Sequence, residues 1–139
     1  MNTPTTVLAF DFGTQRIGVA VGSTITRSAR PLITIDAPIG PARDAALARV
    51  IAEWQPELLI VGLPVHSDGT PHAMTAHATR FGEDLRERFG IRVDYADERH
   101  TSELAQASLA GQGRRGRQKR DEVAAQIILQ GWLDDNAAA

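Results

Sequence analysis

The sequence contains no cysteine. A chain without thiols can form neither a disulfide framework nor a thiolate zinc site, so both kinds of small stapled domain are excluded. No apolar run approaches the roughly 20 residues that a membrane-spanning helix needs, and the first residues lack the basic and apolar regions of a secretory signal. From these absences we expect a protein of the cytoplasm with no membrane partner.

Two common kinds of site are also missing. The phosphate-binding pattern GxxxxGK[ST] does not occur, and the only lysine, Lys119, could not complete one. His72 and His77 are five positions apart on an expected helix, whereas two histidines that share a metal ion on a helix stand three or four apart. We therefore expect neither a P-loop nor a histidine metal site.

The composition is that of a folded domain. The chain has 139 residues, of which 42% are hydrophobic and 23% charged. This length is sufficient to bury a hydrophobic core, and the proportions are those of globular proteins. We expect a single domain over residues 1–139, with short disordered tails at about 1–6 and 135–139.

Positive charge is concentrated in one segment. The formal net charge is −2, but residues 114–120, RRGRQKR, hold five of the 15 basic residues and no acidic one. The rest of the chain then carries 10 basic and 17 acidic side chains, a balance of −7. A local cationic segment on an acidic body suits a polyanionic partner such as nucleic acid, and a flexible solvated loop is the alternative.

The order of predicted elements indicates an α/β fold. Three β-rich segments at 7–11, 17–22 and 31–35 lie close enough together to form an antiparallel meander. Helical and strand patterns then alternate, and the expected elements are a helix from 41 to 55, a strand at 58–61, a helix at 71–89, a strand at 91–96, and helices at 101–109 and 121–133. Strands that alternate with helices are normally parallel. The sequence therefore predicts a mixed five-stranded sheet, antiparallel meander plus parallel strands, flanked by helices.

Carboxylates fall where such sheets place their sites, at the carboxyl ends of strands. Asp11 stands between two phenylalanines at the end of the first strand. An ionised carboxylate there is costly unless it is paired or binds a metal ion, although a hydrogen-bonded turn that serves Gly13 is the alternative. Asp97 and Glu98 follow the fifth strand, and adjacent residues of a strand point to opposite faces, so one of them should face the site. Asp121 follows the basic segment, where an acid that caps the last helix is the simplest interpretation.

Four ordered motifs carry a resemblance to a known family. The chain resembles the YqgF family of Holliday-junction-resolvase-like pre-16S rRNA nucleases. The resemblance covers essentially the whole chain, and the matching segments are FDFGTQRIGVAVG (10–22), IVGLPVHSDGT (60–70), YADERHTS (95–102) and KRDEVAAQIILQGWL (119–133).

The resemblance implies a ribonuclease-H-like fold with three catalytic, metal-binding acids, which fall on Asp11, Glu98 and Asp121. Resolvases of this fold also carry an acid on the fourth strand, where this chain has Gly62 and Leu63. One or two Mg²⁺ or Mn²⁺ ions would be the cofactor, since a pair of such ions about 3.5–4 Å apart assists phosphodiester hydrolysis. Basic side chains would hold the nucleic-acid backbone. The residues expected in that role are Arg99, Arg114, Arg115, Arg117, Lys119 and Arg120.

The function implied is a metal-dependent nuclease that processes the 5′ end of pre-16S rRNA in ribosome biogenesis. The expected partners are precursor rRNA, branched DNA and ribosomal particles, and the expected state is a monomer or weak homodimer. Two alternatives stay open: a Holliday junction resolvase, and a non-catalytic RNA- or ribosome-binding module. An actin-like or sugar-kinase-like ATPase also shares the DFGT…IGVAVG pattern, but those proteins need two such domains, so the pattern more simply reflects a shared fold.

Overall fold

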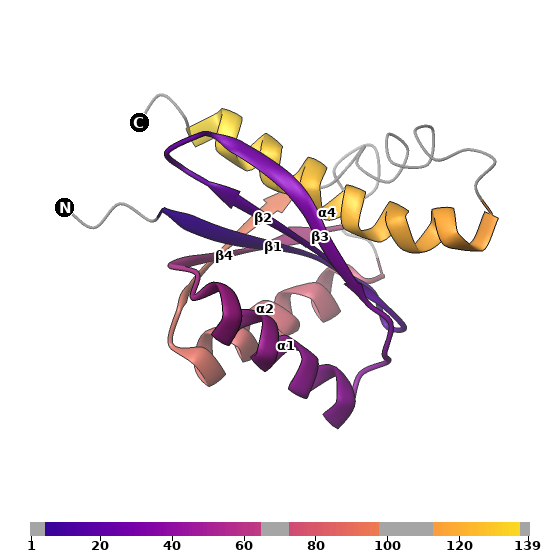
Figure 1. The fold of residues 1–139 in the computed structure, drawn as a ribbon. Helices are drawn as coiled ribbons and strands as arrows, with labels where there is room; N and C mark the ends of the chain where they lie inside the picture. Colours follow the sequence, from indigo (N-terminus) through magenta and orange to yellow (C-terminus); the bar gives the residue numbers. More distant parts are fainter. Residues whose placement is uncertain (1–4, 65–72, 98–112, 137–139) are drawn as a thin grey trace.

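The computed structural model describes residues 5–64, 73–97 and 113–136, with the backbone alone for 113–120. Five strands and three helices lie within these ranges (Figure 1). In chain order they are β1 (Thr6–Phe12), β2 (Ile17–Ser23), β3 (Ser28–Ile35), α1 (Pro41–Trp54), β4 (Leu58–Leu63), α2 (Thr75–Phe89), β5 (Arg92–Asp97) and α4 (Gly113–Asn136).

The strands form one mixed sheet in the order β3-β2-β1-β4-β5. The first three strands are antiparallel neighbours, while β4 runs parallel to β1 and β5 runs parallel to β4. The predicted meander with added parallel strands is therefore confirmed, and β1 is the central strand. Because β1, β4 and β5 are parallel, their carboxyl ends share one edge of the sheet.

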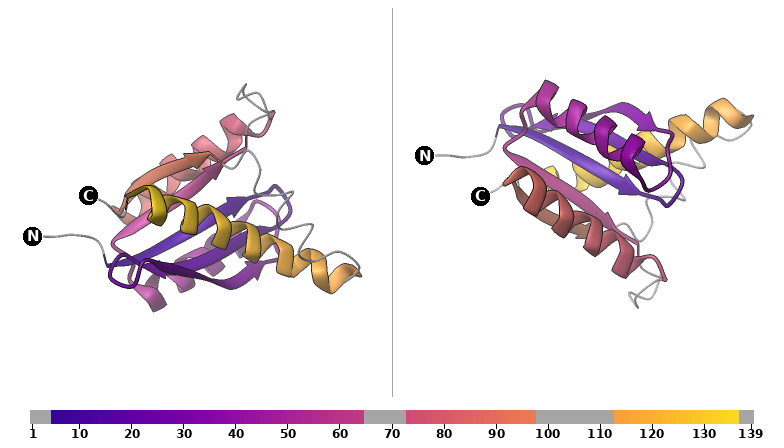
Figure 2. Two further views of the ribbon diagram at one scale, coloured as in Figure 1. Left: turned by 90° about the horizontal axis from the view of Figure 1, so that it is seen from above. Right: turned by 90° about the horizontal axis from the view of Figure 1, so that it is seen from below.

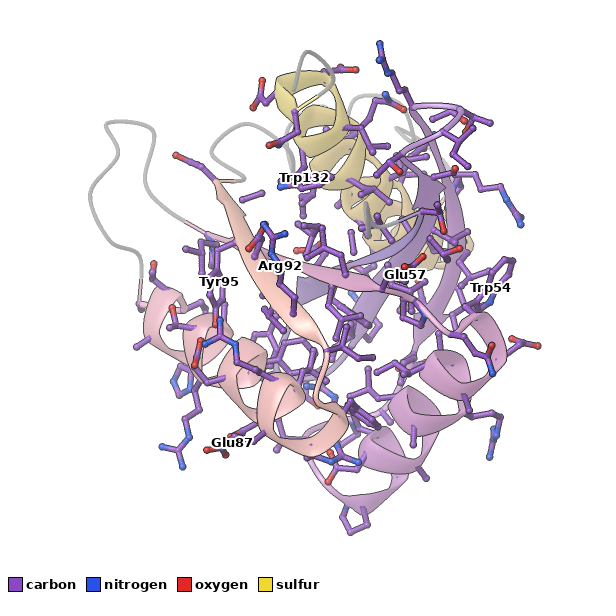
Figure 3. All side chains as sticks on the ribbon, turned by 90° about the vertical axis from the view of Figure 1, so that its left-hand side faces the viewer. Trp54, Glu57, Glu87, Arg92, Tyr95 and Trp132 are labelled. Carbon is purple, nitrogen blue, oxygen red and sulfur yellow. The ribbon has the colours of Figure 1, made fainter. Side chains whose placement is uncertain are left out.

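The two faces of the sheet bury different side chains and carry different helices (Figures 1 and 2). Along β1, Leu8 and Phe10 belong to the core beneath α1 and α2, whereas Val7 and Ala9 belong to the core beneath α4. This alternation is the two-residue period of a strand buried on both faces. Trp132 lies on α4 among the partly buried residues of the α4 core, and Tyr95 of β5 lies toward α2 (Figure 3).

Helical periodicity correctly predicted the buried faces of α1 and α2. Leu47, Val50 and Ile51 are buried from α1, and Ala78 and Leu85 from α2. Pro41 occupies the first turn of α1, where its missing N–H costs no hydrogen bond.

Small residues of β2 allow α4 to pack closely on the sheet. A Cβ added at Gly18 would overlap the Asp121 carbonyl group, and one added at Gly22 would lie 2.9 Å from a methyl carbon of Leu129. From Asp121 to Leu129 the helix rises about 12 Å over eight residues, and from Gly18 to Gly22 the strand advances about 13 Å over four residues. The helix and β2 therefore run side by side in the same direction over this length.

The last helix begins earlier than the sequence indicated. It starts at Gly113, so the basic segment at 114–120 is helical and not a loop, and Asp121 lies inside the helix and does not cap it. Glycines at 111 and 113 suggested a break, since a glycine inside a helix costs about 1 kcal/mol. Once residues 121–136 form a helix packed on the sheet, however, that helix can be extended toward its N-terminus without a second nucleation step. Arginine, glutamine and lysine favour the extension, since they have high helix propensity.

Smaller differences affect the ends of other elements. The second helix begins at Thr75 and not at 71, and Met74 stands at its N-terminal boundary. Thr6, Asp135 and Asn136, which the sequence assigned to the tails, lie in β1 and α4. The helix predicted at 101–109 falls outside the described residues. None of the helices in the described part is long and apolar enough to cross a membrane.

Candidate functional site

Asp11 lies near the carboxyl end of the central strand. It is the second-last residue of β1, and its register partner on β2 is Gly18. By alternation with Val7 and Ala9 its side chain belongs to the α4 face of the sheet. Asp11 is partly buried and is not without an interaction partner.

Asp121 reaches the same point from the other end of the chain. Its backbone carbonyl lies directly over Gly18, so closely that no β-carbon would fit between helix and strand. Gly18 is also the partner of Asp11, and paired residues of neighbouring antiparallel strands lie about 5 Å apart. The fold thus brings the backbones of Asp11 and Asp121 to one residue of β2, and the role of the two acids as metal ligands stays a prediction.

Arg16 is a third charged group at this site. Its Nε donates a 2.7 Å hydrogen bond to Oδ2 of Asp121, and the two side chains are 34% and 19% exposed. Arg16 ends the turn from β1 to β2, five residues after Asp11. Sequence reasoning missed it. The available signal was an arginine between two apolar strands, next to a candidate site acid.

The turn that carries Arg16 is fixed from the opposite face by Arg43. The Arg43 side chain donates from Nη2 to the Gly13 carbonyl at 2.7 Å and from Nε to the Ala37 carbonyl at 2.8 Å. Arg43 is 2% exposed, and its guanidinium carbon lies 5.6 Å from the centre of the Phe12 ring. Burial lowers the pKa of Arg43, while the neighbouring Asp44 opposes that shift. Arg43 was also absent from the predicted site.

Glu122 points to a different strand. Thr34 of β3 donates to its Oε1 at 3.4 Å. Since β2 separates β3 from β1, this contact directs Glu122 away from Asp11. Of the two adjacent acids on α4, Asp121 therefore suits the site role.

The fifth strand ends at Asp97, one of the two neighbouring acids that the sequence offered for the site. Asp97 has the same parity as Val93 and Tyr95, which pack in the core beneath α1 and α2, so Asp97 belongs to the face opposite Asp11. Glu98 and Arg99 lie outside the described residues, and their predicted roles stay predictions. On β4, Gly62 occupies the α4-face position, so this strand supplies no acid there, as the sequence indicated.

The described residues fit part of a divalent metal site. Asp11 and Asp121 supply hard oxygen donors of the kind that Mg²⁺ and Mn²⁺ prefer. Within the described ranges no group of three metal-ligating side chains occurs, and the predicted third ligand, Glu98, is not among them. The side chains of Arg114, Arg115, Arg117, Lys119 and Arg120 also lie outside, although their backbone forms the helical approach to Asp121.

Comparison with known proteins agrees with this arrangement. The family model described as RuvX, Holliday junction resolvase, matches residues 5–135. A protein of Dechloromonas aromatica named "Putative pre-16S rRNA nuclease" is 55% identical over 132 residues, covering 93% of this chain and 90% of its own length. A protein of Chromobacterium violaceum with the same name is 48% identical over 136 residues, covering 95% and 99%.

Two solved structures share the fold at low sequence identity. RuvC of Thermus thermophilus, in complex with a Holliday junction, has a TM-score of 0.55 and 15% identity over 96% of each chain. The Fowlpox virus resolvase, in complex with Holliday junction DNA, has a TM-score of 0.58 and 6% identity, covering 94% of this chain and 97% of its own. The fold is therefore ribonuclease-H-like, as predicted, and the chain belongs to the RuvX (YqgF) Holliday junction resolvase family.

Proposed function

We propose that this chain is a metal-dependent nuclease that hydrolyses phosphodiester bonds in structured RNA, with the 5′ end of pre-16S rRNA as its substrate. One observation carries the proposal: a close backbone contact between α4 and the sheet brings Asp121 over Gly18, the register partner of Asp11. Two acids from distant parts of the chain thus meet at the strand-end edge where such sheets place their sites.

The proposed cofactor is Mg²⁺ or Mn²⁺, held by Asp11 and Asp121 together with Glu98. Such an ion supplies a nucleophilic water at neutral pH and stabilises the charge of the leaving oxygen. Asp11 is suited to a fixed ligand position, since it lies on the central strand with hydrogen-bonded neighbours on both sides. Asp121 is held by a helix that packs chiefly against β1, β2 and β3, and its backbone cannot approach or recede without displacing α4.

RNA is preferred over a DNA junction because relatives of high sequence identity are named for pre-16S rRNA. Proteins named for pre-16S rRNA are 48–55% identical over nearly the whole chain. The resolvases seen with junction DNA share only the fold, at 6–15% identity. Gly62 also leaves β4 without the acid that the family comparison led us to expect in true resolvases. The resulting partners would be precursor rRNA and ribosomal particles in the cytoplasm, for a monomer or weak homodimer.

The test compares two substrates with one preparation of the full chain. A precursor rRNA leader and a four-way DNA junction are incubated with Mg²⁺ or Mn²⁺ and with wild type, Asp11→Asn, Asp121→Asn or Asp135→Asn. Asp135 is an exposed acid near the end of α4 and serves as the matched control. Loss of groups around metal ligands costs 10–100-fold, so loss of a ligand itself should lower RNA cleavage by at least about 100-fold. The Asp135 variant should cleave like wild type.

Other outcomes would change the assignment. Paired symmetric nicks in the junction with intact RNA would replace the proposal by junction resolution. Tight RNA binding without cleavage of either substrate, in any metal, would replace it by the binding-module function.

The basic segment has its own measurement. Arg114, Arg115 and Arg117 replaced together by glutamine should lower the slope of log affinity against log salt concentration by up to about three units. Arg80→Gln, Arg88→Gln and Arg92→Gln together are the control with an equal charge change. An unchanged slope for the first set would remove the segment from the nucleic-acid interface.

A further inference from the structure

The Arg16–Asp121 ion pair occupies a carboxylate that the proposed metal ion also needs. The Nε–Oδ2 distance of 2.7 Å is that of a strong charge-assisted hydrogen bond. The Asp121 side chain is 19% exposed, so screening by water is weaker here than at a surface pair. The Arg16 guanidinium therefore occupies a carboxylate oxygen of Asp121 that the proposed Mg²⁺ or Mn²⁺ ion would also need.

The pair also places a positive charge beside one of the two acids that adjoin Gly18 through their backbones. The Arg16 guanidinium offsets the negative charge of Asp121. A divalent ion held by Asp121 would offset that charge more strongly, and would itself be repelled by Arg16.

The position of Arg16 is built into the fold. A Cβ at Gly13 would lie 2.6 Å from the Arg16 carbonyl oxygen, so the turn is tight. The buried Arg43 donates to the Gly13 carbonyl, and the Ile39 N–H donates to the Thr14 carbonyl at 3.3 Å. The backbone on both sides of the pair is thus held, by this turn on one side and by α4 on the other.

We propose that Arg16 is a positioning residue that competes with the metal ion for Asp121. It holds the carboxylate in the metal-free protein and gives it up when the ion binds. This inference rests on the proposed function, in which Asp121 is a metal ligand. Removing the guanidinium raises the free energy of the metal-free state, where it pairs with Asp121, more than that of the metal-bound state. Metal affinity must then increase by linkage.

The test measures metal affinity and not activity. Mn²⁺ is titrated into wild type, Arg16→Gln and Arg92→Gln while free Mn²⁺ is followed by electron paramagnetic resonance. Arg92 is the matched control, since it pairs with Asp94 at 2.9 Å on β5 and its replacement removes the same charge. We expect Arg16→Gln to lower the Mn²⁺ dissociation constant about fivefold or more, the lower end of ordinary coupling between sites. The control should match wild type.

Thermal unfolding gives the second readout. Without metal, Arg16→Gln should melt below wild type, and added Mn²⁺ should raise its Tm by more than it raises that of wild type. In an Asp121→Asn background, replacing Arg16 should no longer change Mn²⁺ affinity, because the shared partner is gone. Arg16→Lys keeps the charge without the Nε donor and should fall between wild type and Arg16→Gln, which tests the idea if the glutamine variant does not fold.

The outcomes separate this inference from the proposed function. Mn²⁺ binding that Asp11→Asn abolishes, with Arg16→Gln no tighter than wild type, would overturn the competition and leave the metal site intact. An increase of equal size in Arg92→Gln would reduce the effect to net charge and overturn it as well. Absence of Mn²⁺ binding to wild type would overturn both proposals.

Discussion

The two faces of the sheet are packed on different principles. On the α4 face, β2 presents Gly18, Ala20 and Gly22, and at Gly18 the helix backbone rests almost directly on the strand. On the other face, large side chains such as Phe10 and Leu59 lie between the sheet and the helices α1 and α2. Both faces are filled by apolar side chains, and the α4 face adds one point of backbone-to-backbone contact. A carboxylate placed by the first face has less freedom to move.

A pocket follows from the second kind of packing. About 300 Å³ of space lies between α1 and α2, lined in part by Phe12, Leu47 and Phe81 and crossed by the Arg88–Asp44 pair at 3.5 Å. The Asp11 side chain belongs to the opposite face. This pocket and the proposed site are therefore different places in the molecule, and close packing rather than hollow space marks the proposed site.

The largest effect is expected from breaking the close approach at Gly18. A Cβ in Gly18→Ala would collide with helix backbone, which cannot move without undocking α4, so we expect a loss of about 3 kcal/mol or more in unfolding free energy. In Gly82→Ala the new Cβ would lie 2.5–2.9 Å from the hydroxyl and two ring carbons of Tyr95, a side chain and not backbone, and the helix gains from alanine, so the net loss should be smaller, about 1–2 kcal/mol. Urea unfolding measures both. Equal losses would show that backbone contact is not what distinguishes the α4 face.

Gly131→Ala is the reference for both glycine variants. Nothing lies within 4 Å of the added Cβ, and the position is inside α4. Alanine should therefore stabilise the protein by about 0.5–1 kcal/mol.

The next largest effect is expected at Arg43 of α1, the one buried cationic side chain among the described residues. Arg43→Met keeps the apolar stem but leaves the Gly13 and Ala37 carbonyls without their donor. Relief of the guanidinium's own desolvation offsets part of this, so we expect a loss of about 2 kcal/mol. Arg49→Met, at an exposed position of the same helix, is the control and should change stability by less than about 0.5 kcal/mol. Similar melting curves for the two variants would contradict the anchoring role.

A smaller effect should follow at the contact between α4 and the edge strand. Gln130 accepts from the Ala29 N–H at 3.0 Å and donates to the Arg27 carbonyl at 3.0 Å. Gln130→Ala should cost about 1 kcal/mol, the usual net value of such bonds. Amide hydrogen exchange at Ala29 should accelerate, while exchange in β4 stays as in wild type. Unchanged exchange at Ala29 would mean that α4 is held by its apolar face alone.

The smallest effect is expected in the titration of Tyr95, on the face of the sheet that α1 and α2 cover. Burial raises the pKa of Tyr95 to about 12, and the hydrogen bond to Glu83 at 2.5 Å adds to the shift. Because the folded pKa exceeds the unfolded value near 10, the stabilisation is present below pH 10 and is lost as pH rises through about 12. Tyr95 is the only tyrosine, so tyrosinate absorbance reports it alone. Glu83→Gln should lower the midpoint, and a wild-type midpoint near 10 would contradict the burial.

Local sequence patterns predicted the strands, the inward faces of the helices and the acids at the ends of strands. Apolar runs identified the strands, and helical spacing identified the inward faces of α1 and α2 through residues such as Leu47 and Leu85. Asp11 and Asp121 were assigned from motifs, and in the fold both adjoin Gly18 through their backbones. The start of α4 was predicted wrongly, because glycine spacing and charge indicated a loop where docking of the following residues favours a longer helix.

Arg16 and Arg43 show which features the sequence could not predict. Each acts through a contact over a long stretch of sequence, to Asp121 and to the Gly13 turn, and a single arginine carries no local signal of its partner. The sequence by itself determined the strand and helix periods, and through them the mixed sheet with acids at its carboxyl edge. Only the tertiary structure decided which cation meets which acid, because that choice depends on how closely α4 approaches Gly18, and no local propensity encodes the distance between two elements.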